Sequence, residues 1–289
     1  MLALRKTFRG TALASAALAI AMVSAATAPA SAQGKLDAQY TVTLAGIPIG
    51  KGTWVIDISD SQYTASAKGT TTGLLRAFTG GEGSTVAHGT LQAGKPASSS
   101  YTATINTSKK TDAIQLTINN GTVKDAKVDP PVDPDPERVP VTEADTRGIL
   151  DPMSASLLRI AGTGELLSPE ACRQTMAIFD GRLRYDLKLA YKRMDKVKAD
   201  KGYAGPVVVC AVFFSPVSGY VPSRKAIRYI SKIQDMEVWL APIAGTRVLV
   251  PFRAEGPTPV GNAVMEATQF VSVPNPGPTR ASANGNKTQ

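Results

Sequence analysis

Apolar and polar residues alternate with a period of two along much of the chain. In the longest such stretch, residues 183–191, every odd position is Leu or Tyr, and Arg184, Asp186 and Lys188 lie between them. Successive side chains of a β-strand point to opposite faces, so this pattern predicts strands with one buried and one solvated face. Shorter stretches of the same kind are residues 40–44, 54–58 and 114–118.

Glycine-containing pairs stand between the alternating stretches. Asn120–Gly121 and Asp180–Gly181 each follow one such stretch and precede another. Both pairs tolerate the positive φ that a type I′ turn requires, so each predicts a tight β-hairpin. Ala244–Gly245 predicts a third turn, between residues 238–241 and 247–252.

One apolar stretch, residues 207–214, does not alternate. Its sequence is Val-Val-Val-Cys-Ala-Val-Phe-Phe, without a polar side chain. A continuous apolar run of this length is typical of a strand that is covered on both faces. We therefore expect it at the centre of the sheet.

Helix signals are few. Asp151 followed by Pro152 is a favourable start, because Asp caps a helix and Pro suits its first position. We expect a helix over residues 153–161, ended by Gly162. A second short helix is predicted over residues 73–79, which include the apolar Phe78.

These elements predict a mainly β fold. The expected architecture is a large curled antiparallel sheet, a half-barrel or incomplete barrel, with one or two short helices packed on it. Residues 129–140 are rich in proline, which removes backbone donors, and they predict an exposed loop within the domain.

Residues 1–32 have the order of a secretory signal peptide. A basic start without acids precedes an apolar stretch over residues 11–26, and residues 30–32 form a small-x-small cleavage site. We expect cleavage between Ala32 and Gln33. The alternative is a membrane-spanning helix, but the second half of the stretch is too weakly apolar to favour it.

Export of the protein determines the expected domain boundaries of the mature chain and its expected compartment. Residues 33–273 are expected to form a single β-rich domain, and residues 274–289 a disordered tail rich in Pro, Gly, Asn, Ser and Thr. No twin-Arg pair precedes the apolar stretch, so the general secretory route to the periplasm is expected. No cysteine lies near Ala32, so we expect no membrane anchor after cleavage.

The net charge limits the expected binding partners, and the cysteine content predicts a disulfide. The signal peptide takes three of the 32 Lys and Arg, which leaves 29 − 23 = +6. This mild excess does not favour nucleic acid, although it allows weak attraction to anionic envelope surfaces. Cys172 and Cys210 are the only cysteines. In an oxidising compartment they predict a disulfide, the alternative being two separate buried thiols.

Enzyme motifs are incomplete. Residues 89–95 match the start of a phosphate-binding P-loop, but Pro96 replaces the hydroxyl that magnesium requires, so a strand-connecting loop is expected. His88, the only histidine, could share a strand face with Ser84, but no nucleophile elbow encloses the serine. A surface or hairpin histidine is therefore expected. Asp57, Asp180, Asp186 and Glu237 are candidates for sugar hydrolysis without any signature.

Metal ligands are also sparse, because zinc would need more His or Cys residues. Four acids between residues 129 and 137 could approach calcium, but the intervening prolines prevent a tight wrap, and a solvated acidic loop is expected. We therefore expect no metal, no cofactor and no enzymatic activity. The four acids are Asp129, Asp133, Asp135 and Glu137.

A charged segment spans residues 180–201, with eight Lys or Arg against four Asp. Such runs usually form a solvated face. The functional alternative is a docking face for anionic lipid headgroups or for an acidic partner.

The second half of the chain has a recognisable order of features. It resembles the proteobacterial exported family known as domain of unknown function 3108, over most of residues 36–271. That family resembles periplasmic lipoprotein carriers in strand content, which implies a half-barrel around an acyl-binding cavity. The features are Asp151-Pro152-x-Ser154, Cys172, Phe179-Asp180-Gly181-Arg182, Cys210, Val238-Trp239-Leu240 and Val250-Pro251-Phe252-Arg253.

Our leading hypothesis is a periplasmic, non-enzymatic binding protein. It would carry or chaperone a lipid, acyl chain or lipoprotein on its curled sheet. One alternative is an envelope scaffold that binds a protein partner through a strand edge or the 180–201 segment, and a weaker one is a cell-wall hydrolase. The expected ligand-binding residues are Trp54, Phe78, Tyr185, Tyr191 and Trp239.

Overall fold

The computed structural model describes residues 33–59, 61–73, 81–92 and 95–274. The predicted signal peptide, Phe78 and all but the first residue of the predicted tail lie outside these residues. The strands are β1 (Gly34–Leu44), β2 (Ile47–Ser59), β3 (Gln62–Thr71), β4 (Gly81–Gln92), β5 (Lys95–Thr107), β6 (Thr111–Asn119), β7 (Thr122–Asp129), β8 (Leu158–Arg159), β9 (Thr175–Phe179), β10 (Arg184–Lys198), β11 (Lys201–Gly202), β12 (Ala204–Ser218), β13 (Glu237–Pro242), β14 (Val248–Thr258) and β15 (Gly261–Pro274).

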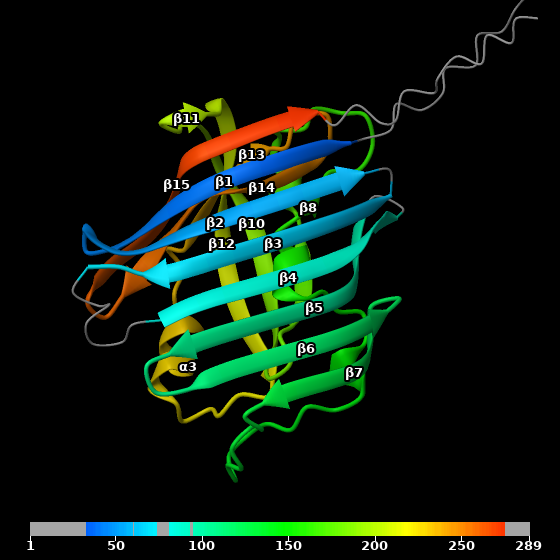
Figure 1. Ribbon diagram of the computed structural model, residues 1–289, viewed down its shortest axis with the longest axis vertical. Helices are drawn as coiled ribbons and strands as arrows, with labels where there is room; N and C mark the ends of the chain where they lie inside the picture. Colours follow the sequence, from blue (N-terminus) through cyan, green and yellow to red (C-terminus); the bar gives the residue numbers. More distant parts are fainter. Residues whose placement is uncertain (1–32, 60, 74–80, 93–94, 275–289) are drawn as a thin grey trace, which may run out of the picture. The chain divides into compact units, whose positions relative to one another are not determined.

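All the described strands belong to one sheet, which confirms the mainly β fold. The order along it is β7-β6-β5-β4-β3-β2-β1-β15-β14-β13-β12-β10-β9, with β8 and β11 off this path. Neighbours on the path are antiparallel, and β7 and β9 are the two ends, so the sheet is not closed. In Figure 1, β1 to β7 form the front layer and β10 and β12 cross behind it.

The last strand ties the two halves of the sheet together. β15 pairs with β1 from Gly34↔Pro274 to Leu44↔Ala263, and with β14 from Arg253↔Glu266 to Thr258↔Gly261. The chain thus returns to its first strand at its end. A meander alone would need only sequential neighbours, so this long-range pairing is what makes one sheet of the two halves.

The two ends of the sheet are joined by a short connecting segment rather than by a strand pair. The Ile149 amide donates to the Gly121 carbonyl at 3.0 Å, and the Leu150 amide donates to the Ala177 carbonyl in β9 at 2.8 Å. Arg182 adds an ion pair with Asp112 in β6 at 3.2 Å. The bond from Leu150 satisfies a backbone carbonyl of β9 that an open sheet edge would leave unpaired.

The predicted turns are found, one of them in a different form. Asn120 and Gly121 have φ of 48° and 70°, as a type I′ turn requires. The Asp180 hairpin is looser than predicted, because β9 ends at Phe179 and β10 begins at Arg184. The Asp180 carboxylate accepts the amides of Arg182 and Leu183 at 2.8 and 2.7 Å, and this stabilises a longer loop.

The helix predicted over residues 153–161 is wrong in length. Asp151 does cap it, but α2 covers only Pro152–Ala155. The chain then enters β8, where Leu158 pairs with Leu249 of β14. Strand pairing with a distant segment therefore overrides the local helix signal. The other helical elements are α3 (Lys225–Ile230) and the 3₁₀ turns η1 (Ala144–Thr146) and η2 (Pro169–Cys172).

β12 lies between two apolar clusters, which confirms that it is covered on both faces. Val207 and Val209 belong to the first core, whereas Val208 and Cys210 belong to the second core. The first core also holds Leu36, Tyr40, Trp54, Ile56, Ile58, Leu116, Trp239, Phe252 and Phe270. The second core also holds Leu158, Ile160, Ala171, Cys172, Leu189, Val238, Leu240 and Leu249.

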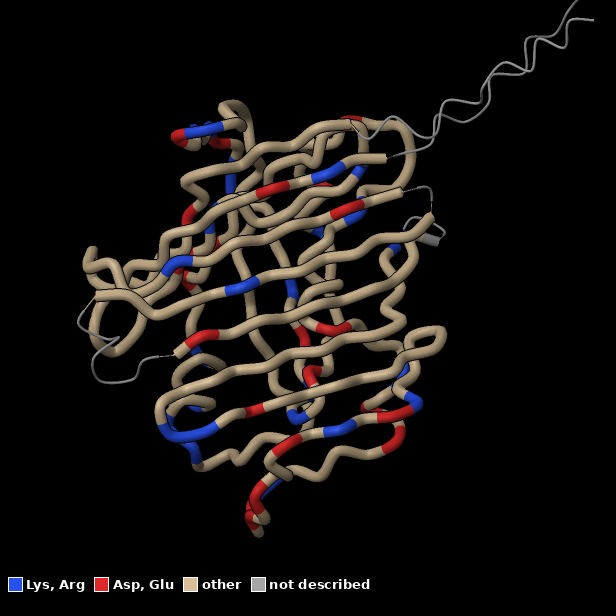
Figure 2. The backbone as a smooth tube through the Cα atoms, viewed as in Figure 1, with Lys and Arg blue, Asp and Glu red and all other residues tan. Residues whose placement is uncertain are grey.

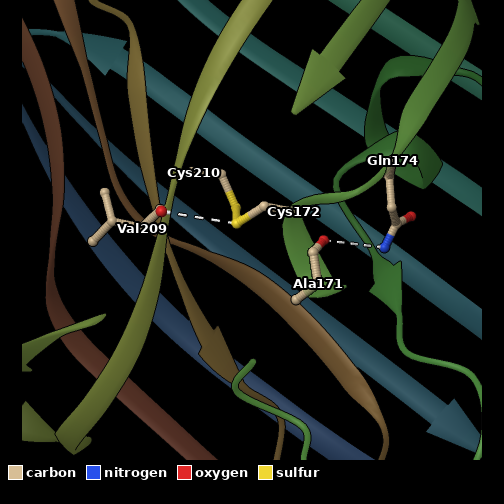
Figure 3. The surroundings of a disulfide bond; sticks show 5 residues. All are labelled: Ala171, Cys172, Gln174, Val209 and Cys210. Atoms are coloured by element: carbon tan, nitrogen blue, oxygen red, sulfur yellow. Dashed lines mark hydrogen bonds between the residues drawn. A yellow bond between two sulfur atoms is a disulfide. The ribbon is translucent and has the colours of Figure 1, made fainter. Parts of the chain in front are cut away.

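The predicted disulfide between Cys172 and Cys210 is confirmed. It ties η2 to the middle of β12, and both cysteines are fully buried (Figure 3). The Cys172 sulfur lies 3.8 Å from the Val209 carbonyl oxygen. The bond thus fixes the segment between β8 and β9 over the second core.

Candidate functional site

A cavity of about 970 Å³ opens beside the second core. Its main wall comes from β9, β10, β12, β13, β14 and β15. The apolar residues of this wall are Met176, Ile178, Tyr185, Leu187, Leu189, Val212, Val238, Leu240, Ala254 and Met265. The wall is therefore almost wholly hydrocarbon.

The alternation in β10 explains how this wall forms. Tyr185, Leu187 and Leu189 point into the cavity, while Lys188 is exposed. On the polar face, Arg184 and Asp186 form an ion pair at 2.8 Å. The two-residue period thus separates ligand-accessible hydrocarbon from solvent-facing charge.

A second wall is made by α3 and the segment that follows it. Tyr229, Ile230, Ile233 and Met236 contribute their side chains to the lining. No residue of α3 is buried, so the helix has few contacts that fix it to the sheet. Elements with few buried apolar contacts open at low free energy. This wall is the part of the cavity best suited to move.

The floor comes from α2 and β8. Pro152, Ala155, Ser156 and Leu158 line it. Leu157, between them, packs in the first core. Neighbouring residues of this segment therefore contact the cavity and the packed core in turn. The segment therefore separates the two environments.

A buried polar network lies behind the floor. The Tyr63 hydroxyl donates to the Ser154 hydroxyl at 2.5 Å, and Ser154 donates to the Asp151 carboxylate at 2.5 Å. The Asp151 carboxylate also accepts the Met153 and Ser154 amides, both at 2.9 Å. Burial raises the pKa of the Asp151 carboxyl above its ordinary value, against these donors. The Asp-Pro-x-Ser sequence thus encodes a satisfied internal cap.

Few charges face the cavity. Lys225, Glu237 and Glu255 are the only residues with ordinarily charged side chains among its described lining residues. Glu237 pairs with Arg193 at 2.8 Å, and Glu255 pairs with Arg253 at 2.5 Å. The described lining is thus mainly hydrocarbon, and its two glutamates are paired with neighbouring arginines.

The predicted ligand-binding residues lie in different parts of the structure. Tyr185 lines the cavity, with its ring 5.2 Å from that of Phe214. Trp54 is 7% exposed and packs in the first core beside Tyr40, at 6.4 Å between ring centroids. Tyr191 is 42% exposed and lies beside a bulge in the pairing of β10 with β12.

Trp239, the remaining described residue of that set, also packs in the first core. Its indole N–H donates to the Asp195 carboxylate at 2.9 Å, which holds the pKa of that carboxyl below its ordinary value. The guanidinium carbons of Arg193 and Arg253 lie 5.3 and 5.0 Å from its ring centroid. This ring stabilises the outer surface by cation–π contacts instead of lining the cavity.

The residues considered for catalysis are dispersed. His88 is exposed on β4, with Nδ1 3.1 Å from the Thr64 hydroxyl, and Ser84 is exposed on the same strand. β4 runs to Gln92, so the strand-connecting loop expected over residues 89–95 is largely strand. The strand continues there because Thr90 and Leu91 pair with Ala97 and Pro96 in β5.

The acids considered for metal binding or hydrolysis are also apart. No group of three or more His, Cys, Asp or Glu side chains within reach of one ion occurs among the described residues. Asp180 caps its loop, and Asp186 and Glu237 take part in ion pairs. Asp57 lies on β2, opposite Thr64 of β3.

Half of the eight basic residues in the charged segment 180–201 form ion pairs with the described acids. Arg182 contacts Asp112, and Lys192 and Arg193 contact Glu237. Basic and acidic residues are interspersed along the tube in Figure 2. The pairing lowers the free positive charge that a docking face would present.

Tyr185 is the one described residue of the predicted ligand-binding set that lines the cavity, and the α3 wall was not predicted. The helix covers six residues, Lys-Ala-Ile-Arg-Tyr-Ile, too few to show a helical period. Within the described residues, neither helix has the length and apolar content of a membrane span. An open antiparallel sheet with a large apolar cavity on one face defines the class of this protein.

Comparison with known proteins gives its family. Residues 39–268 match the family described as "Protein of unknown function (DUF3108)", so the chain belongs to that family and the predicted resemblance is confirmed. No curated protein matches the chain significantly. The crystal structure of a β-barrel-like protein of domain of unknown function DUF1849 from Brucella abortus aligns at a TM-score of 0.45 and 10% identity, over 84% of this chain and 98% of that one.

Proposed function

We propose that this protein is an exported, non-enzymatic binding protein that holds the acyl chain of a lipid or lipid-modified protein in the cavity. The observation that carries the proposal is the cavity of about 970 Å³ with an apolar wall of Leu, Ile, Val, Met and Tyr side chains. Ligand sites of comparable size, about 300–1,000 Å³, are typical of proteins that bind small molecules.

The hydrophobic effect supplies the driving force. Each methylene transferred from water into such a wall stabilises the complex by about 0.8 kcal/mol. Among the described lining residues there is no cluster of acids, bases or nucleophiles that would react with the chain, so binding without reaction is the activity that we propose. α3, which has no buried residue, would form the wall that opens.

The periplasm is the compartment that we propose. Residues 1–32 have the signal-peptide order, and the disulfide between Cys172 and Cys210 suits an oxidising environment. An acyl chain cannot cross an aqueous compartment unaided. A diffusing carrier with an apolar cavity would meet that need.

Binding of a fluorescent fatty acid, cis-parinaric acid, tests this function. Ala254 lines the cavity and is partly buried, so Ala254→Phe should fill part of the space and lower the affinity at least about tenfold. The matched control is Ala126→Phe on β7, where the side chain is exposed and away from the cavity lining. This control should bind like the natural protein.

Two results would overturn the proposal. One is the absence of saturable parinaric acid binding by the natural protein. The other is equal affinity for Ala254→Phe and Ala126→Phe when thermal unfolding shows both to be folded. Mass spectrometry of a solvent extract from the purified protein would identify any chain that it carries from the cell.

A further inference from the structure

Two hairpin turns lie side by side at one rim of the cavity. The Ala45 amide in the β1–β2 turn donates to the Asn262 carbonyl beside the β14–β15 turn at 2.8 Å. Figure 1 shows both turns on the same side of the sheet, at the left of the view. Pro257, Thr258 and Pro259 of the second hairpin belong to the cavity lining.

These turns carry the two most exposed large hydrophobic side chains of the described residues. Ile47 is 63% exposed and Val260 is 69% exposed. Neither residues 41–50 nor residues 256–265 contain a charged residue, and the tube is tan at both turns in Figure 2. By contrast, the turn between β5 and β6 carries Lys109 and Lys110. The two turns beside the cavity therefore combine a lack of charge with exposed large apolar side chains.

α3 lies at the same cavity and carries uncompensated positive charge. Arg224, Lys225, Arg228 and Lys232 are all exposed. None of them forms an ion pair with the described residues, whereas Arg184, Lys192 and Arg193 of β10 do. Tyr229 is 37% exposed among them, and aromatic rings of this kind favour the boundary between water and lipid.

We infer that this rim, formed by the β1–β2 and β14–β15 turns and by α3, docks on the surface of an anionic phospholipid bilayer. The apolar turns would enter the headgroup region, and the basic residues of α3 would contact the phosphates. Because Lys225 and Pro259 both line the cavity, docking brings its mouth to the lipid. The docking surface goes beyond the proposed function, and only the transfer of a chain into the cavity rests on it.

Charge and hydrophobicity together select a bilayer as the partner. A protein partner for four free cations would need matching acids, and the exposed turns beside them would need an apolar pocket. An anionic bilayer supplies negative charge for the cations and an apolar interior for the turns. It does so whichever way the protein is rotated in the plane of the membrane. Two weak signals, a shallow apolar insertion and a basic patch, give reversible attachment, as a diffusing protein requires.

Co-sedimentation with vesicles tests the inference. The natural protein should bind vesicles of equal parts phosphatidylglycerol and phosphatidylcholine, and binding should weaken with added salt. Pure phosphatidylcholine vesicles should bind at least about tenfold less, because each basic residue near an anionic surface contributes roughly a fivefold factor.

Two pairs of variants separate the two signals. Ile47→Asp with Val260→Asp should lower binding at least about tenfold, and its control is Ile105→Asp, a residue of β5 that is 53% exposed. Lys225→Glu with Arg228→Glu should do the same and remove the salt dependence. Its control is Lys124→Glu with Lys127→Glu, exposed residues of β7.

The vesicle-binding results can be distinguished from the parinaric acid results that test the cavity. Ala254→Phe should keep vesicle binding even where it loses parinaric acid, so a failed carrier function leaves the docking surface standing. The inference is overturned if the natural protein ignores anionic vesicles. It is also overturned if the rim variants bind like their controls, or if a dimer buries Ile47 and Val260 in solution.

Discussion

β12 and β13 present alternate residues to two different surroundings. On one face, Val209 and Trp239 enter the first core, where Phe252 and Phe270 pack with ring centroids 5.4 Å apart. On the other face, Val238 lies in the second core and borders the cavity. The same strands thus meet close packing on one side and accessible hydrocarbon on the other.

This difference shows that the apolar pattern of a strand does not determine how closely each of its faces is packed. A strand with apolar side chains on both faces must be covered on both, but the pattern does not say how tightly. The first core is covered by a second layer of sheet. The cavity side is covered by α2, η2 and α3, which are short, and short elements leave space between them.

The largest expected effect is the contrast between two leucines. Leu36 is fully buried in the first core, whereas Leu187 is partly buried at the cavity wall. Leu36→Ala should lower the free energy of unfolding by about 2–5 kcal/mol, because it leaves a new void in a packed core. Leu187→Ala should lower it by about 1 kcal/mol, since the methyl groups removed already border open space.

Urea unfolding followed by circular dichroism measures both values. Equal losses for the two leucines would contradict the difference between the faces. A loss for Leu187→Ala with no change in parinaric acid affinity would weaken the assignment of that wall to the ligand.

The next effect comes from the disulfide, which fixes η2 over the second core. Replacing both Cys172 and Cys210 with Ser should lower the free energy of unfolding by about 2–4 kcal/mol, because the unfolded chain gains the freedom of a loop with a sequence separation of 38. Dithiothreitol should lower the stability of the natural protein to a similar extent and leave the double variant unchanged. Full stability after reduction would contradict this role.

The sequence predicted well wherever local chemistry determines structure. Alternation located β1, β2 and β6, and Asn120–Gly121 located a turn, because side-chain period and positive φ act over a few residues. The helix expected after Asp151 stops at Ala155 because Leu158 pairs with Leu249 in β14. That partner is distant along the chain, so no local window contains it.

The site was predictable only in part, for a similar reason. The apolar face of β10 pointed to Tyr185, but large aromatic side chains suit packed cores as well as cavities, and Trp54 and Trp239 lie in the first core. α3 is too short to carry a period. Its importance comes from the residues that it faces, which only the fold brings together.

The smallest expected effect concerns the buried carboxyl group between the two environments. Burial raises the pKa of Asp151 above its ordinary value of 3.8, so the folded protein keeps a proton that the unfolded chain has lost. Stability should therefore fall as the pH rises from 3.8 through the raised pKa, and then level off. The hydrogen bonds from Met153 and Ser154 limit the loss.

Asp151→Asn tests this assignment because the amide can still cap α2 but does not titrate. Relative to the natural protein, its stability should increase across that pH window, as measured by urea unfolding at a series of pH values. Ser154→Ala removes a donor to the carboxylate, so it should raise the pKa further and extend the fall to higher pH. Parallel pH profiles for the natural protein and Asp151→Asn would show that Asp151 does not control this dependence. The boundary between the packed core and the cavity would then owe its pH response to other groups.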